Sequence, residues 1–383
     1  MKKHPSLLLI YILIGISCSS KAQIDNTNSS LSDKKSTTET KILYKNLTDL
    51  SKKSILFGHQ DDLAYGVNWK YEAGRSDVKE VTGDYPGVYG WDLGGLEKKS
   101  DKNIDGIPFD KMRQYIKEGH SRGGIITLSW HFDNPLTGKN AWDITPKSLA
   151  SALPGGESHE KFKSWLDEGV KFILTLKDKN GKPIPILYRP YHELTGTWFW
   201  WCQNNASPEE FKTLWKYTVD YLKKKGVHNL IYVYNTSDFK TKEDFLKYYP
   251  GNDYADILSF DTYQYEDPTV SQSFEQNVNR QFSIIDEVAK ENSKLTAFAE
   301  TGYEQIPYNK WWTETLLKAI GKYKISFVVA WRNHGYNEYM NPPKMHYYVP
   351  YKGHPNEQDF IDFYNLKETL FQSEVTKEKL YKK

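Results

Sequence analysis

Two glutamates stand at the ends of apolar stretches in this chain. Glu193 ends a stretch that begins at Ile184 and reads IPILYRPYHE. Glu300 ends a second stretch, LTAFAE, that begins at Leu295. Each pattern predicts a short buried strand with a carboxylate at its C-terminal end. A retaining glycosidase needs two such groups, because one protonates the leaving oxygen while the other attacks the sugar carbon. The aromatic run Trp198–Trp201 suits the walls of a sugar-binding cleft, so the residues together indicate a polysaccharide hydrolase.

The two glutamates must hold opposite protonation states at one pH. The acid needs a raised pKa, which partial desolvation and a second negative charge supply, whereas the nucleophile needs donors or a cation to stay ionised. Tyr263, His192 and Arg189 are candidates for that support, and Arg189 is equally suited to be a buried structural partner of carboxylates at the strand ends. Retention requires carboxyl groups about 5–5.5 Å apart and inversion roughly 6.5–9.5 Å, a distance that sequence does not supply.

The apolar pattern predicts eight strands, most of them separated by helix-like stretches. The strands are expected at residues 54–60, 85–93, 124–131, 184–194, 229–236, 255–263, 295–303 and 325–333. The helices are expected at 109–122, 157–176, 207–225, 274–292, 311–323 and 357–371. Continuous apolar strands alternating with helices are typical of a parallel sheet buried on both faces. We therefore predict an α/β fold, a (β/α)8 TIM barrel that forms a single catalytic domain over residues 41–375, with its active site at the C-terminal strand ends.

Other polar and aromatic side chains gather at the expected strand ends. They are Asp61, Asp62, Trp91, Asp92, His131, Asp261, Tyr263, Trp331, Arg332 and Asn333. A core strand with no catalytic role has little reason to end in so many ionisable groups. Asp61, Trp91 and Asp261 are therefore candidates to support the site or to contact substrate. Asp62 and Asp92 are candidates on the same ground.

Four motifs in order along the chain resemble those of glycoside hydrolase family 26. They are Gly58–Gln60 (GHQ), Ser129–Pro135 (SWHFDNP), Arg189–Trp201 (RPYHELTGTWFWW) and Phe298–Gly302 (FAETG). The resemblance extends from about residue 42 to residue 371. It implies a (β/α)8 barrel that retains anomeric configuration. Most members of the family are endo-β-1,4-mannanases, and some are β-1,3-xylanases or mixed-linkage β-glucanases.

The resemblance also implies roles for individual residues. Glu193 would be the general acid/base and Glu300 the nucleophile. His192 would bond to the sugar or to the nucleophile, and His131 would contact the sugar in the −1 subsite, next to the bond cleaved. Tyr263 would hydrogen-bond Glu300 and help keep it ionised.

Three further residues take their expected places from the same resemblance. Trp331 would form the floor of the −1 subsite, Arg332 would reach toward −2, and Trp198 would lie near the acid/base on the leaving-group side. The chain has Cys202 where the family pattern has glycine, which puts in doubt the shape of the loop on that side and not the chemistry.

We expect no metal and no cofactor. The pair His192-Glu193 begins like a zinc-protease helix motif, but that motif needs a second histidine four residues after the first, and this position is Gly196. The other histidines show no ligand spacing. With 51 basic and 49 acidic residues, the charge balance gives no sign of a nucleic-acid partner.

The N-terminal residues predict export. A basic start and an apolar run over 7–16 indicate a signal peptide within residues 1–22. Gly15–Cys18 resembles a lipobox, which would leave a lipid anchor on Cys18, whereas Ser20–Ala22 resembles an ordinary cleavage site; we favour the lipobox. Residues 23–40 are polar and are expected to form a disordered tether. Cys202 is then the one cysteine left in the body of the chain, so no intrachain disulfide is expected.

The expected protein is a monomer in the periplasm, or an outer-membrane lipoprotein, of a Gram-negative bacterium. Its substrate is expected to be mannan, galactomannan or glucomannan. A β-1,3-xylanase or mixed-linkage β-glucanase on the same scaffold is the alternative, and a non-catalytic glycan-binding lipoprotein is a third reading. The segments 61–84, 132–157 and 334–356 are expected to cap the cleft, and the basic end of the chain, 377–383, is expected to be a solvated tail.

Overall fold

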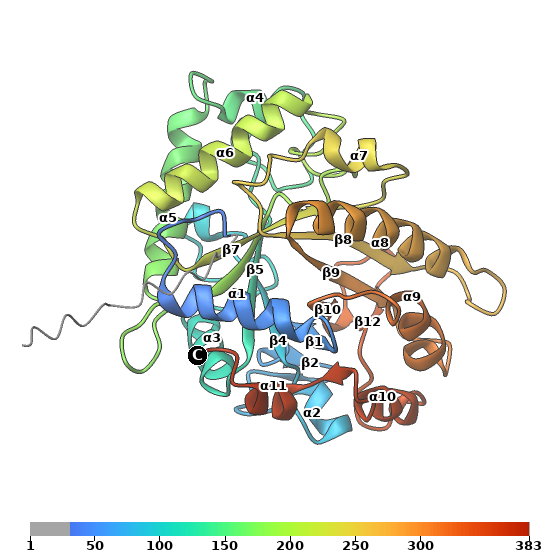
Figure 1. The fold of residues 1–383 in the computed structure, drawn as a ribbon. Coiled ribbons are helices and arrows are strands. Elements are labelled where there is room, and N and C mark those ends of the chain that lie inside the picture. The colour runs from blue at the N-terminus through green and yellow to red at the C-terminus, as the bar shows by residue number, and fades with distance from the viewer. Residues whose placement is uncertain (1–30, 383) are drawn as a thin grey trace, which may run out of the picture.

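The computed structural model describes residues 31–382, and its centre is a closed barrel of eight parallel strands (Figure 1). The strands pair in chain order, and the last pairs with the first. They are β1 (Ile55–Gln60), β4 (Val88–Asp92), β5 (Ile125–Trp130), β6 (Ile186–Pro190), β7 (Leu230–Thr236), β8 (Ile257–Gln264), β9 (Leu295–Tyr303) and β10 (Phe327–Ala330). The eight predicted strands and the single-domain TIM barrel are confirmed.

Helices cover the outside of the barrel. They are α1 (Thr38–Leu50), α2 (Asp77–Thr82), α3 (Phe109–Ser121), α4 (Ser148–Ala152), α5 (His159–Leu174), α6 (Pro208–Lys224), α7 (Lys242–Lys247), α8 (Ser273–Asn292), α9 (Leu317–Ile320), α10 (Glu357–Tyr364) and α11 (Gln372–Glu378). A 3₁₀ turn, Leu96–Lys98, and a π-helical turn, Trp311–Leu316, complete the set. The predicted helix at 311–323 is therefore a π-turn followed by α9. The one predicted at 357–371 ends at Tyr364 and gives way to a short strand.

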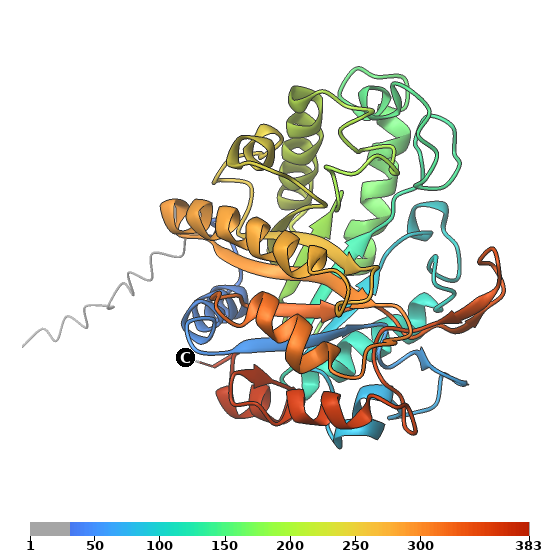
Figure 2. The same ribbon diagram turned by 90° about the vertical axis from the view of Figure 1, so that its right-hand side faces the viewer.

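Short strands lie outside the barrel proper. They are β2 (Tyr65–Gly66), β3 (Trp69–Lys70), β11 (Gly335–Asn337), β12 (Lys344–His346) and β13 (Thr369–Leu370). The hairpin of β11 and β12 projects from the C-terminal end of the barrel, whereas α1 and the C-terminus lie at the opposite end (Figure 2). The loops at the hairpin end are the ones that surround the active site in this fold.

The barrel interior changes character along its length. Apolar side chains such as Leu56, Val88 and Leu187 form its lower layers. Because side chains alternate along a strand, the same inner faces carry polar residues nearer the C-terminal ends, including Ser129, Arg189, Asn235 and Asp261. Gly58 is required between these layers, since a Cβ there would lie 2.9 Å from both Val88 and Val329. The packed core thus supports a polar layer at the mouth.

The N-terminal segment corrects the expectation of a disordered tether. Ser32 donates from its backbone N–H and its hydroxyl to the buried carboxylate of Asp256, at 2.6 and 2.9 Å. Thr37 then caps α1 by accepting from the N–H of Thr40 at 3.2 Å. The expectation is therefore wrong for residues 31–40, because polar residues can be ordered by specific partners. Residues 23–30, the signal peptide and Cys18 lie outside the described residues.

The C-terminal end is also less free than expected. Leu380 is buried with the barrel-end cluster, and the Tyr381 hydroxyl donates to the carbonyl of Gly124 at 2.9 Å. Apolar and aromatic groups between the lysines account for this packing. The expectation of a solvated tail is thus wrong for Leu380 and Tyr381, whereas residues 377–379 are exposed as expected.

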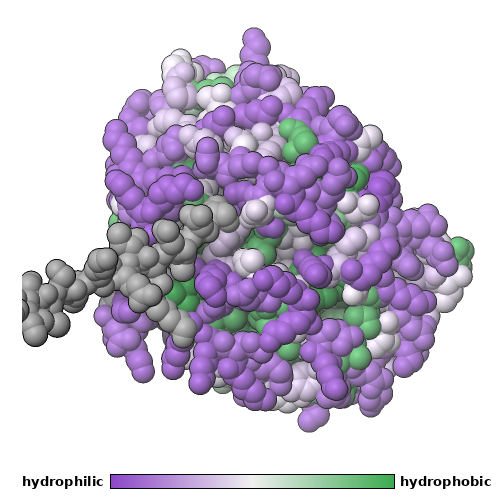
Figure 3. Space-filling model, in the orientation of Figure 1, coloured by the Kyte–Doolittle hydropathy of each residue, from purple (hydrophilic) through white to green (hydrophobic). Residues whose placement is uncertain are grey.

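One face of the molecule is mostly polar. Hydrophilic residues dominate the face shown in Figure 3, with scattered hydrophobic side chains among them. Across residues 31–382, no helix combines the length and apolar character needed to cross a bilayer.

Helix α1 closes the N-terminal end of the barrel, which makes its apolar face part of the core. Leu47 is fully buried there, beside the innermost strand residues. We expect Leu47→Ala to lower the free energy of unfolding by about 2–5 kcal/mol, through lost burial and a residual cavity. The control is Lys45→Ala, because the exposed pair of Lys45 and Asp49 contributes at most about 1 kcal/mol. Equal denaturant unfolding midpoints for the two variants would contradict a core role for α1.

Candidate active site

Glu300 reaches the inner face of the barrel because the pairing of β8 and β9 slips by one residue. Phe260 pairs with Phe298, but the next residue of β8, Asp261, pairs with Glu300. Ala299 is therefore the extra residue of a β-bulge. Since side chains alternate along a strand, an uninterrupted β9 would turn Glu300 outward, away from Asp261. The bulge instead directs the carboxylate into the mouth of the barrel.

Glu193 lies in a turn beyond β6, whereas the sequence had predicted a strand up to residue 194. The strand ends at Pro190, and Tyr191 and Glu193 both have left-handed backbone, with φ of 51° and 55°. Such a conformation costs on the order of 1–3 kcal/mol for a residue other than glycine and persists only when neighbours hold it. Here Asn235 accepts the backbone N–H of Glu193 at 2.8 Å. The strained turn thereby aims the Glu193 carboxylate across the barrel mouth.

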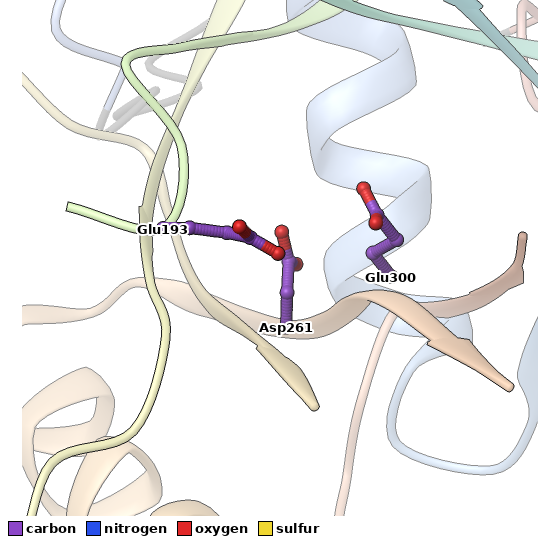
Figure 4. A group of neighbouring side chains, drawn as sticks. All are labelled: Glu193, Asp261 and Glu300. Atoms are coloured by element: carbon purple, nitrogen blue, oxygen red, sulfur yellow. The ribbon is translucent and has the colours of Figure 1, made fainter. Parts of the chain in front are cut away.

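The two glutamates face each other across the end of the barrel (Figure 4). Their side chains come from opposite sides, and Asp261 lies between them in this view. Oxygens of Glu193, Asp261 and Glu300 lie within 4.8 Å of one another. One oxygen of each carboxylate lies within this distance, which is consistent with the close spacing of about 5–5.5 Å expected for retention.

Arg189 is the positive charge of the site. It donates from Nη2 to Glu300 Oε2 at 2.8 Å and from Nη1 to Asp261. Asp261 also accepts from Asn235 Nδ2 at 2.8 Å. Arg189 is almost entirely buried, so it serves as the structural partner of two carboxylates. Of the two roles considered for Arg189, this position supports the structural one.

Tyr263 is the second donor to Glu300. Its hydroxyl donates to Oε1, the oxygen that Arg189 does not bind, which agrees with the role that the family resemblance implied. Each oxygen of Glu300 thus accepts a hydrogen bond from one neighbour. These two donors fix the orientation of the carboxylate at the barrel mouth.

The environment of Glu193 favours the protonated form. Burial raises its pKa to about 7, and the negative charge of Glu300 acts in the same direction, against the opposing effects of Arg189 and of the Trp198 hydrogen bond. Trp198 donates from Nε1 to Glu193 Oε2 at 2.7 Å. A carboxyl group with a pKa near neutrality can donate a proton in one step and accept it in the next.

The three carboxylates are close enough to be considered as a metal site. Most of their oxygens, however, already accept hydrogen bonds from Arg189, Tyr263, Asn235 or Trp198. The buried guanidinium also supplies positive charge where a cation would have to sit. This donor set suits paired acids and a fixed arginine better than it suits a metal ion.

Two histidines form a chain that ends at a buried acid. Asp92 Oδ2 bonds His131 Nδ1 at 2.8 Å, and His131 Nε2 lies 3.1 Å from His192 Nε2. Burial opposes a charge on His131, but Asp92, together with the charges of Asp105 and Glu300, raises the pKa of His131. Burial and the neighbouring His131 lower the pKa of His192 well below its usual value. His192 therefore contacts His131, and among the described residues the structure shows no bond from it to Glu300.

The residues that follow β10, the last strand of the barrel, lie at the same end of the barrel. Trp331 is half-buried next to Arg332, whose guanidinium lies 6.0 Å from its ring. Arg332 Nε lies 3.2 Å from Asp105 Oδ1, and Nη1 donates to the Tyr65 hydroxyl at 3.3 Å. Tyr65 in turn donates to Asp61. Asp105 and Tyr65 therefore hold Arg332 in place, and Asp61 holds Tyr65.

Trp91 does not belong to the site, and its expected role is wrong. The residue is fully buried and stacks on Tyr115 of α3, with ring centroids 5.7 Å apart. Because side chains alternate, Asp92 faces the barrel mouth and Trp91 must face the helix layer. Asp62 also points away from the cleft and bonds His59 Nδ1 at 2.8 Å.

Some contributing residues were missed by the sequence analysis. Asn235 supports both Glu193 and Asp261, and Asp105 holds Arg332. Trp142 stacks on His131, with centroids 5.3 Å apart, and is about half exposed. A polar residue at an inward position near the end of β7 was a usable signal for Asn235. Asp105 and Trp142 lie in loops, where no periodicity indicates direction.

Cys202, where the family pattern has glycine, is buried and donates from Sγ to the Glu193 carbonyl at 3.4 Å.

Comparisons with known proteins place this geometry in context. Residues 32–342 match the model of glycosyl hydrolase family 26. A mannan endo-1,4-β-mannosidase of Bifidobacterium adolescentis is 32% identical over 377 residues, covering 92% of this chain and 36% of its own length. The chain thus spans about a third of that relative, and 55% and 54% of two others.

Solved structures of similar length also match. The structure of a GH26 β-mannanase from Bacteroides ovatus has 43% sequence identity and a TM-score of 0.85, covering 91% of this chain and 98% of that one. The catalytic domain of a GH26 endo-β-1,4-mannanase from Bacillus sp. JAMB-750 has 32% identity and a TM-score of 0.83, covering 92% and 96%.

Proposed function

The chain belongs to glycosyl hydrolase family 26, and on that premise we propose that it is a retaining endo-β-1,4-mannanase acting on mannan, galactomannan or glucomannan. The observation that carries the proposal is the pair of facing glutamates, with oxygens within 4.8 Å and with contrasting partners. The names of the relatives supply the substrate class.

The reaction follows from the partners of each carboxylate. Glu193, held partly protonated by burial, gives its proton to the leaving glycosidic oxygen. Glu300, bound by Arg189 and Tyr263, attacks the sugar carbon and forms a covalent intermediate. Glu193 then removes a proton from water, which releases the sugar from Glu300 with its configuration retained.

The substrate assignment is tested on polymers. We expect turnover of linear β-1,4-mannan, with a ladder of internal products, and much slower turnover of lichenan and β-1,3-xylan. Product lengths over time distinguish internal cleavage from release at one end. Turnover of lichenan or xylan with none on mannan would overturn the mannanase proposal in favour of the alternative substrates. Binding without turnover of all three would favour the glycan-binding reading.

The protonation of Glu193 predicts the alkaline side of the pH profile. Since the acid form is needed, kcat/KM should fall as pH rises through about 7. Trp198→Phe removes a hydrogen bond that stabilises the carboxylate, so the pKa of Glu193 should rise and this limb should move to higher pH. Trp165→Phe, which changes a tryptophan on α5 outside the site, is the control. A limb that stays in place in Trp198→Phe would contradict this account.

We also propose that the protein is exported and carries a lipid on Cys18, as a periplasmic or outer-membrane lipoprotein that acts as a monomer. The support is the residue pattern of the signal segment, including Gly15–Cys18. Leu31 packs at the barrel end opposite the catalytic pair, so an anchor before it would leave the cleft open. Intact mass of the mature protein tests this. An N-terminus at Gln23 would contradict lipidation while leaving export in place, and light scattering tests the monomer.

A further inference from the structure

Lysines are concentrated at the N-terminal end of the barrel. Residues 34–53, which include α1, and residues 374–382, near the C-terminus, contain nine lysines and four acidic residues. Eight of these nine lysines are exposed. The whole chain has a formal net charge of only +2, so the excess of lysine is a property of this end and not of the protein as a whole. We call this surface the lysine face.

The two segments of the lysine face adjoin each other in space. Asn46 of α1 donates from Nδ2 to the carbonyl oxygens of Leu380 and Lys382, at 3.0 and 2.9 Å. Lys53, which follows α1, lies 3.3 Å from Glu378 of α11. Figure 1 and Figure 2 both show α1 near the C-terminus, and Figure 2 shows them at the end of the barrel away from the hairpin of β11 and β12. The lysines of both segments therefore belong to one surface.

The acidic residues of the lysine face do not neutralise it. Asp49 is shared by two lysines, with oxygens 3.1 Å from Lys45 Nζ and 2.8 Å from Lys52 Nζ. The side chains of Lys35 and Lys382 form no ion pair with any residue of the described chain, 31–382. Ion pairs between exposed side chains are weak, because water and salt screen them. The positive charge of this face is therefore available to an anionic partner.

The mouth of the barrel has the opposite charge. Asp238 and Glu266 lie beside the catalytic carboxylates in the lining of a pocket of about 510 Å³. No lysine, arginine or histidine is among the residues that line this pocket, all of which belong to the described part of the chain. An anionic surface therefore attracts one end of the molecule and repels the other, which gives the protein a preferred orientation on such a surface.

The lysine face suits a layer of lipid headgroups. Its basic residues are all lysines, and an ammonium group acts as a point charge, whereas arginine is better matched to a fixed partner with paired oxygens. Leu31 packs at this same end of the barrel. Twelve residues separate Leu31 from Cys18 and can extend over at most about 45 Å, so a lipid on Cys18 would keep this end near a bilayer.

We propose that the lysine face docks onto a membrane surface rich in anionic phospholipid, and that this contact holds the barrel with its mouth pointing away from the bilayer. The negative potential of such a membrane attracts each lysine close to it, and several lysines on one face add their effects. The inference extends the proposed lipid anchor but does not depend on it, because it concerns the charges of the folded residues 31–382.

Vesicle sedimentation tests the proposal with the chain from Gln23 onward, which keeps every described residue and lacks Cys18. We expect binding to vesicles of equal parts phosphatidylglycerol and phosphatidylcholine, and roughly tenfold or weaker binding to phosphatidylcholine alone. Salt at about 1 M should release the bound protein, because it screens exposed charges beyond about 3 Å. Equal binding to both kinds of vesicle, or binding that salt leaves unchanged, would overturn the proposal. Tighter binding to a DNA duplex than to the mixed vesicles would overturn it in favour of nucleic acid as the partner.

A triple variant assigns the binding to the lysine face. It combines Lys35→Gln, Lys52→Gln and Lys382→Gln, which remove three positive charges from exposed side chains. We expect roughly fivefold weaker binding to the mixed vesicles for each lysine, or about a hundredfold in all.

The control variant removes the same number of positive charges from exposed loops at the mouth end. It combines Lys139→Gln, Lys240→Gln and Lys352→Gln. The control should bind the vesicles as the wild type does, and an equal loss in the two variants would overturn the assignment. Because all six side chains are exposed, neither variant is expected to disturb folding.

Hydrolysis of mannohexaose by vesicle-bound protein tests the orientation. A soluble substrate should reach a mouth that points away from the bilayer, so bound and free protein should hydrolyse it at the same rate. Slower hydrolysis by the bound protein would overturn the proposed orientation. No hydrolysis by either form would count against the proposed function, whereas the vesicle measurements would still decide the docking.

Discussion

Glu300→Ala should abolish turnover of β-1,4-mannan, with kcat lower by roughly four orders of magnitude or more, because Glu300 forms the covalent intermediate and the neighbouring Asp261 is held by Arg189 and Asn235. The fold should survive the change. Arg189 keeps its ion pair with Asp261 after Glu300 is removed, so no buried charge is left without a partner. Mannohexaose hydrolysis under single-turnover and steady-state conditions measures the loss.

A small anion provides the sharper test of the same variant. Azide can occupy the space that the Glu300 side chain leaves and attack the sugar carbon from the same side. With an activated aryl mannobioside, Glu300→Ala plus azide should yield a glycosyl azide of inverted configuration. Glu314→Ala, which removes an exposed glutamate, should behave as wild type with and without azide. Undiminished hydrolysis in Glu300→Ala would show that Glu300 is not the nucleophile.

The barrel and the catalytic pair were predictable because each rests on a local pattern. Apolar runs with helix-like stretches between them indicate a parallel barrel, and a barrel brings all C-terminal strand ends together. Glu193 and Glu300 could therefore be placed at one mouth before any distance was known. The resemblance of Arg189–Trp201 to a family motif added the individual roles.

Side-chain direction was not predictable to the same extent. Asp92 and Trp91 are adjacent and both end a strand, but only Asp92 faces the mouth, since neighbours on a strand face opposite ways. The bulge at Ala299 reverses this alternation for Glu300, and the local sequence AFAET contains no pattern that predicts the bulge. Register is a property of two paired strands, so one strand's sequence cannot specify it.

The prediction of disorder for the N-terminal segment was wrong for a different reason. Residues 31–40 are polar, which is the composition of disordered chains. They are ordered because Asp256, far along the chain, accepts two hydrogen bonds from Ser32 inside the protein. Composition reports the average tendency of a segment, whereas a specific buried partner is a tertiary fact.

Glu193→Gln should separate the two halves of the reaction. Its loss of proton transfer should lower kcat/KM on mannan by roughly 10²–10⁴-fold, because the leaving sugar oxygen then departs without a proton. An aryl mannobioside with a phenol of low pKa needs no such help, so its first step should stay fast and the intermediate on Glu300 should accumulate. A burst of phenol followed by slow turnover would report this.

The same variant tests the electrostatic account of the site. Glutamine cannot ionise, so the fall of kcat/KM through pH about 7 should disappear in Glu193→Gln. The amide should also preserve the contact with Trp198 in size, although its oxygen is a weaker acceptor than a carboxylate. If the alkaline limb persisted unchanged, it would belong to another group, and Glu193 would lose its assignment as the acid. Equal losses on mannan and on the aryl substrate would point instead to a positioning role for Glu193.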